Sequence, residues 1–169
     1  MPGVRRSEVT RHEKLHLKAL FIDDFVKRFL KIRRRKKFPH REVECFIKWL
    51  FTNSNRIGRG AHKTVLKVYS DSEKRLLVLK VGDKKAIKSD LKTYNRIPVK
   101  IRNRYFAKIY DNNTEYCLFQ KYGKKGRISD ERRKKLRQMG KKYRIWDHIR
   151  NDNVRIIDGK PKIVDANLR

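Results

Sequence analysis

The first third of the chain shows a helical pattern of apolar positions. Apolar side chains recur at intervals of three and four residues, at Leu17, Leu20, Phe21, Phe25, Phe29 and Ile32, and this spacing predicts an amphipathic helix with one apolar stripe. Pro39 breaks that helix and suits the first turn of another, where the stripe repeats at Val43, Phe46, Ile47, Leu50 and Phe51. We therefore expect a basic helical hairpin over residues 1–55, with its stripe used for packing.

From Arg56 onward the pattern changes to short apolar runs that are typical of strands. Runs at Val65–Val68 and Leu76–Val81 flank a polar turn and predict a strand pair. The same rules predict helices over Lys84–Arg96 and Ser129–Lys142, strands over Tyr105–Tyr110 and Tyr116–Tyr122, and a hairpin of Val154–Ile157 with Lys162–Val164 across Asp158-Gly159. The expected fold class is α+β.

The chain has a large excess of basic over acidic residues. Its 169 residues include 48 Lys and Arg against 18 Asp and Glu, a formal net charge of +30. A hydrophobic share of 38%, with 10% aromatic residues, argues against a disordered polycation. The surplus predicts an anionic partner, which could be a nucleotide, a nucleic acid or an anionic membrane surface. The basic runs Arg33–Lys37 and Arg132–Lys135 are the candidate contacts.

Cysteine content and hydropathy bear on the compartment. Cys45 and Cys117 are too few for a disulfide framework, and both lie in apolar runs, which predicts buried free thiols. No apolar run approaches the roughly 18 residues of a transmembrane segment, and none of signal-peptide length follows the basic N-terminus. We expect a cytoplasmic protein, with peripheral attachment to the inner membrane face as one use of its charge.

Two features could carry chemistry. Gly58 and Gly60 stand before the first strand pair, where glycines let backbone N–H groups approach a phosphate or simply make a turn. No helix follows them directly, which excludes the Rossmann fingerprint and the P-loop. Lys80 interrupts an apolar strand. It either extends to solvent at a strand edge or pairs with a phosphate and a helix carboxylate.

The order of these motifs resembles the protein-kinase-like superfamily, and within it the small PhoP-regulatory-network protein and lipopolysaccharide-core kinase group. The matching segments are the glycine-rich loop at Gly58–Val65, the lysine strand at Val78–Lys80, the hinge at Lys121–Gly123, the catalytic loop at Asp147–Asn153 and the metal motif at Val164–Asn167. The resemblance covers about residues 56–169. It implies an N-lobe of antiparallel sheet plus helix to about residue 122, followed by a truncated C-lobe.

That resemblance implies ATP and Mg²⁺ as cofactors and an ATP-dependent phosphotransferase activity. Lys80 would hold the α- and β-phosphates, and Asp90 would hold Lys80. The other implied contacts are Gly58 and Gly60 over the phosphates, backbone groups from Gln120 to Tyr122 at the adenine, and Asn153 and Asp165 on the magnesium.

Departures from the family pattern leave two questions open. Counting back from Asn153 by the family's spacing reaches His148 rather than Asp147, and either residue could face the acceptor hydroxyl. No activation segment precedes Arg169, so the acceptor could be a protein or an anionic small or lipid-linked molecule. The function is then either a minimal phosphotransferase or an inactive kinase-like module that binds nucleic acid, ribosomal or other polyanionic partners through its basic faces.

Overall fold

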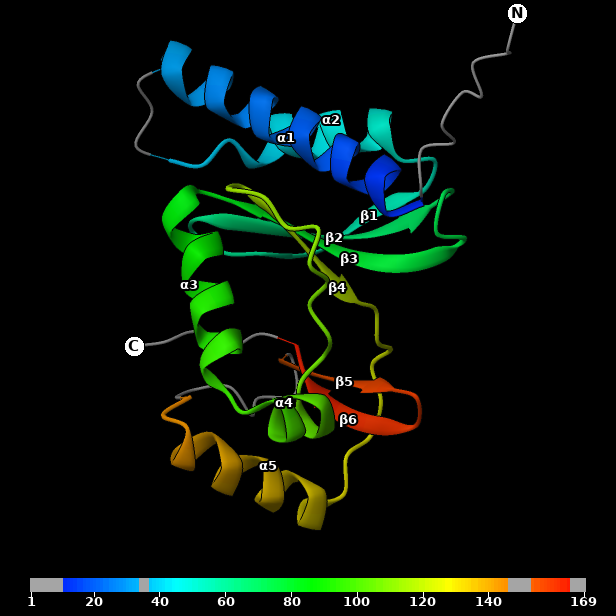
Figure 1. Cartoon of the computed structure of the whole chain (residues 1–169), viewed down its shortest axis with the longest axis vertical. Coiled ribbons are helices and arrows are strands. Elements are labelled where there is room, and N and C mark those ends of the chain that lie inside the picture. Colours follow the sequence, from blue (N-terminus) through cyan, green and yellow to red (C-terminus); the bar gives the residue numbers. More distant parts are fainter. Residues whose placement is uncertain (1–10, 34–36, 146–152, 165–169) are drawn as a thin grey trace, which may run out of the picture.

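The computed structural model describes residues 11–33, 37–145 and 153–164, and it is an α+β fold (Figure 1). In chain order its elements are α1 (Arg11–Arg33), α2 (His40–Leu50), β1 (Ser54–Arg59), β2 (Lys63–Ser70), β3 (Arg75–Gly82), α3 (Lys84–Arg96), α4 (Val99–Tyr105), β4 (Cys117–Lys121), α5 (Asp130–Lys142), β5 (Val154–Ile157) and β6 (Lys160–Ile163).

Strands β1 to β4 form one antiparallel sheet in the order β1-β2-β3-β4. Lys80 lies opposite Val65 on β2 and opposite Leu118 on β4, so it belongs to the central strand pair. Strand β3 is buried at every position from Leu77 to Gly82, because both faces of the sheet are covered. Side chains alternate across a strand, so the odd-numbered residues of β3 face one layer and Lys80 faces the other.

Helices α1 and α2 lie side by side over one face of the sheet (Figure 1). They share a core with it, whose fully buried members include Ile22 of α1, Ile47 of α2, Leu79 of β3 and Phe119 of β4. The stripe expected along α2 is confirmed, with Ile47 at 0% exposure. The two helices therefore bury the outer face of the sheet and leave Lys80 on the opposite one.

The stripe expected along α1 is wrong in its rotation. Leu17, Leu20 and Phe21 are 47%, 45% and 60% exposed, and the buried positions are Leu15, Ala19, Ile22 and Val26. Helix α1 has apolar residues on more than one side, so their spacing alone does not determine which face is buried. The buried carboxylate of Asp23 fixes the rotation of the helix, because its Oδ1 atom accepts hydrogen bonds from Thr114 Oγ1 (2.6 Å) and from the backbone N–H of Tyr116 (3.2 Å).

A second core joins the end of α3 with α4, α5 and the β5–β6 hairpin, which lie on the far side of the sheet from α1 (Figure 1). Its buried side chains are Ile97, Phe106, Leu136, Met139, Ile145, Val154 and Ile163. The expected helices at 84–96 and 129–142 and the final hairpin are confirmed. Asp158 (φ 52°) and Gly159 (φ 74°) make the tight turn of that hairpin.

The strand expected over Tyr105–Tyr110 is wrong. Helix α4 occupies its start, and single bridges at Phe106 and Ile109 replace a continuous strand. Pro98 is the reason, because it precedes α4 as its N-cap and its carbonyl accepts the Arg102 N–H at 2.9 Å. A proline near the start of a helix loses no intrahelical hydrogen bond, so Pro98 both ends α3 and begins α4.

The two cysteines differ in their surroundings. Cys117 is buried, and burial raises the pKa of its thiol well above the ordinary value. Cys45 is exposed, which contradicts the expectation of two buried thiols. It sits on the outer side of α2 between the buried Val43 and Ile47, which point into the core.

Candidate functional site

A cavity of about 470 Å³ lies on the face of the sheet opposite α1 and α2. Its upper wall comes from β1, the β1–β2 turn, β2, β3 and β4, and its lower wall from Gly123, Asn153, Arg155 and Val164. A volume in the range of roughly 300–1,000 Å³ suits a small-molecule ligand. The cavity therefore sits between the two cores, where a ligand could contact both.

The charge of the cavity wall is one-sided. Five lining residues are cations: Arg59, Lys63, Lys80, Lys125 and Arg155. No acidic residue is among the lining residues in the described part of the chain. Low-dielectric walls strengthen the field of such a cluster, so the cavity favours an anionic ligand.

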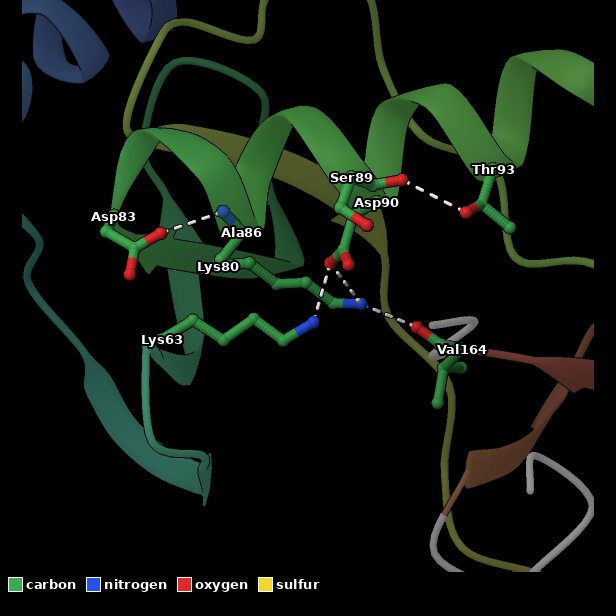
Figure 2. A network of polar contacts seen from close by, with 8 residues as sticks. All are labelled: Lys63, Lys80, Asp83, Ala86, Ser89, Asp90, Thr93 and Val164. Carbon is green, nitrogen blue, oxygen red and sulfur yellow. Dashed lines mark hydrogen bonds and ion pairs between the residues drawn. The ribbon is translucent and has the colours of Figure 1, made fainter. Parts of the chain in front are cut away.

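Figure 2 shows two lysines from neighbouring strands that converge on one carboxylate of α3. Lys63 Nζ lies 2.7 Å from Asp90 Oδ2, and Lys80 Nζ lies 3.7 Å from the same atom. The side chains of Lys63, Lys80 and Asp90 are 12%, 5% and 5% exposed. Lys80 also donates a hydrogen bond to the carbonyl oxygen of Val164 at 2.7 Å. A half-buried and a buried ammonium group thus converge on one carboxylate at the wall of the cavity, where a phosphate group could contact both.

The start and the buried face of α3 place Asp90 toward β3. Asp83 caps the helix by accepting the Ala86 N–H at 2.8 Å, as Figure 2 shows. Ile87, Asp90 and Thr93 are its buried positions and recur every three residues, so they share one face. The carboxylate is therefore held by the helix that packs beside the central strand.

The glycine segment is a hairpin turn at the edge of the cavity. Gly58 follows a bulge in β1, and the Gly60 N–H donates to the Lys63 carbonyl at 2.9 Å. Arg59 between them donates to Glu44 of α2 at 2.8 Å. Burial opposes ionisation of Glu44, but hydrogen bonds from Arg59 and Thr64 outweigh it and hold the pKa below its ordinary value. Helix α2 thereby fixes the turn through a charged carboxylate.

A buried amide group lies at the back of the cavity. Gln120 is 3% exposed and lines the wall beside Val78, its partner in the strand register. Its Oε1 atom has no hydrogen-bond partner among the described residues. A buried acceptor without a partner costs about 1–3 kcal/mol. A ligand with an N–H group directed at this wall would remove that penalty.

The lower wall depends on the close approach of two segments. A Cβ atom on Gly123 would lie 2.6 Å from Ile157 Cγ1 and 2.8 Å from Arg155 Cβ. The next residue, Lys124, exchanges two backbone hydrogen bonds with Ile156, of 3.1 and 2.8 Å. Glycine at 123 therefore lets the chain that leaves β4 pack directly on β5 and close the cavity from below.

The structure brings most of the described candidate residues together. Gly58, Gly60, Lys80, Gln120 and Asn153 line the cavity, and Asp90 lines a small adjoining pocket with Lys80 and Gln120. Tyr122 is not a lining residue, and Lys67 Nζ lies 5.7 Å from the centroid of its ring. Asp147, His148 and Asp165 lie outside the described residues, so their predicted roles stay predictions.

Lys63 and Arg155 are cavity residues that sequence reasoning did not select. Lys63 lies inside the glycine-rich segment, and its contact with Asp90 (2.7 Å) is shorter than that of Lys80 (3.7 Å). Strand alternation could have found it, because Lys63 lies two residues before Val65 and so shares the face of Lys80. No local signal marks Arg155, because the contact of β5 with residues 123–124 is long-range.

Comparison of the chain with protein-family models finds no match, and comparison with curated proteins finds no significant match. Within the described ranges, no group of three or more His, Cys, Asp or Glu residues could hold a metal ion. The fold and the site together define an α+β protein with a cationic cavity between its two cores.

Proposed function

We propose that this protein is a kinase-like, ATP-dependent phosphotransferase that binds its nucleotide in the cavity under the central sheet. The observation that carries the proposal is the convergence of Lys80 and Lys63 on Asp90, beside a cavity lined by five cations. Phosphoryl transfer requires little beyond positioning and neutralisation of phosphate charge. A lysine that is held between a central strand and a helix carboxylate can position a phosphate and neutralise its charge. The order of the motifs, which resembles that of kinases, supports the same function.

The nucleotide would occupy the cavity with its phosphates at the lysine pair. Lys80 is held by Asp90 and by the carbonyl of Val164, so its ammonium group is positioned before a ligand arrives. The glycine turn lies over the same space with Gly58 and Gly60 in the wall. The adenine would extend toward Gln120, where its amino group could donate to the unpaired Oε1 atom.

Magnesium would bind with the triphosphate rather than to a preformed protein cage. Mg²⁺ usually takes one or two protein oxygens plus phosphates and water. Asn153 lines the cavity and would supply one side-chain oxygen, and its backbone carbonyl accepts the Val164 N–H at 2.9 Å. The bound ion would neutralise charge that develops between the β- and γ-phosphates. Asn153 is thus hydrogen-bonded to Val164, which directly precedes Asp165 in the sequence. Asp165 is the second magnesium ligand that the resemblance implies.

Millimolar Mg-ATP is expected to raise the melting temperature of the protein. A ligand that binds only the folded state at about 100 times its Kd stabilises that state by about 2.7 kcal/mol. Differential scanning fluorimetry with ATP, ADP and AMP, each with and without Mg²⁺, measures the effect. We expect the order ATP, ADP, AMP and a requirement for Mg²⁺, accompanied by release of ADP from labelled ATP. Absence of any shift with Mg-ATP would contradict the nucleotide site.

Lys63→Met is expected to weaken ATP binding more than AMP binding. Hydrogen bonds to charged groups contribute about 1.5–3 kcal/mol each, so loss of one phosphate contact should lower the ATP affinity about tenfold or more. Lys67→Met is the matched control, because Lys67 is on the same face of β2 but does not line the cavity. Isothermal titration with both nucleotides compares the variants. Equal losses for ATP and AMP would reject a phosphate-binding role for Lys63.

A further inference from the structure

A second cationic hollow lies between α4, α5 and β6, and we call it the α5 groove. Its volume is about 250 Å³, and none of its lining residues lines the nucleotide cavity. Its rim is formed by Arg104, Arg132, Lys135 and Lys160, which are all exposed. No carboxylate lines it among the described residues. Glu131 of α5, which does not line the groove, pairs with Lys135 at 3.1 Å.

The floor of the α5 groove is apolar. It consists of Leu136, which is 1% exposed, and of the half-buried Tyr105 and Pro161. The guanidinium group of Arg104 lies 5.3 Å from the centroid of the Tyr105 ring. The groove therefore has an apolar floor and cations at its edge. Helix α5 continues the positive charge beyond the groove, because seven of its 13 residues are Lys or Arg.

We propose that the α5 groove binds single-stranded nucleic acid, as an activity separate from the nucleotide cavity. Phosphates would lie along the rim cations, and an unstacked base would lie on the Tyr105 floor. Single-strand binders combine a cationic groove that follows the backbone with aromatic side chains under the bases. The one aromatic floor residue, Tyr105, would take one base, and the rim cations would take the phosphates beside it.

Two other anionic partners fit the groove less well. An acidic peptide held as an added strand needs free backbone donors, and Pro161 of β6 has no N–H group. A bilayer needs large apolar side chains that project from the surface, and the apolar floor residues are buried or half-buried. The missing N–H group of Pro161 and the buried floor therefore favour the nucleic acid. Within the described ranges, no helix has the length and hydropathy to cross a membrane.

The test is fluorescence anisotropy of labelled oligouridylate and oligothymidylate at several salt concentrations. The groove variant is Arg132→Glu combined with Lys135→Glu. The matched control is Lys134→Glu combined with Arg137→Glu, which makes the same charge change on the same helix outside the groove. We expect the groove variant to lose at least tenfold in affinity and the control less than threefold. The salt slope of the groove variant should fall by about 1.4, because each phosphate contact to a single strand contributes about 0.7.

Tyr105→Leu separates base stacking from charge and keeps the test informative if the double variant misfolds. It should weaken binding severalfold without changing the salt slope, because it removes no phosphate contact. Equal losses in the groove and control variants would overturn the proposal, since binding would then follow net charge alone. Equal affinity for a duplex, or equal competition by polyglutamate, would also overturn it. The Mg-ATP thermal shift of all these variants should match that of the wild type, which keeps this test independent of the nucleotide site.

Discussion

Replacing Lys80 with methionine is expected to abolish the stabilisation by Mg-ATP and the turnover of labelled ATP. Lys80 is the cation at the centre of the sheet, 5% exposed, and it is held between Asp90 and the Val164 carbonyl. If ATP binds as proposed, the substitution removes a charge-assisted contact with its phosphates in a site of low dielectric. We expect at least a hundredfold loss in ATP affinity by titration calorimetry, with ADP release at the level of a blank.

The fold should survive the Lys80→Met substitution. Asp90 keeps its 2.7 Å contact with Lys63, so no buried carboxylate loses all its partners. Methionine also suits an apolar strand whose neighbours Leu79 and Val81 are fully buried. Lys121→Met is the control, since Lys121 lies on β4 outside the cavity and pairs with Asp158 at 2.6 Å. A wild-type Mg-ATP shift in the Lys80 variant would contradict the proposed site.

Ile22→Ala is expected to destabilise the whole protein by about 2–5 kcal/mol, which is typical of truncating a large buried side chain. Ile22 is 0% exposed in the core that α1 and α2 share with the sheet. Its neighbour Phe21 is 60% exposed, and Phe21→Ala should change the stability by no more than about 0.5 kcal/mol. Urea unfolding followed by circular dichroism and by tryptophan fluorescence measures both variants.

The pair of variants decides which face of α1 is buried. The apolar stripe that the sequence suggests contains Phe21 and omits Ile22, so it predicts the opposite ranking of the two losses. Ile47→Ala of α2 should behave like Ile22→Ala, because both side chains lie in the same core. A larger loss for Phe21→Ala than for Ile22→Ala would show that the helix is rotated relative to the structure.

Local patterns predicted the elements whose boundaries carry their own chemical signals. Helix α3 has the Asp83 cap, helix α5 has the Ser129 cap, and the final hairpin has Asp158-Gly159 at its turn. These signals act over a few residues, so the sequence contains them in full. The strand expected at Tyr105–Tyr110 failed because helix α4, which begins after Pro98, extends through Tyr105, and only single bridges at Phe106 and Ile109 follow it.

The sequence by itself determined the α+β class, most helices and strands, the surplus of cations and the candidates Gly58, Gly60, Lys80, Asp90, Gln120 and Asn153. Only the tertiary structure decided which side of α1 is buried, that Lys63 is the nearer partner of Asp90, and that Arg155 faces the cavity. The physical reason is that each of these depends on contacts between segments distant in the chain. The carboxylate of Asp23 is oriented by residues 91 and 93 positions away, and Lys80 bonds to a carbonyl 84 positions away. Periodicity describes the surface of one element and contains no information about the element that will cover it.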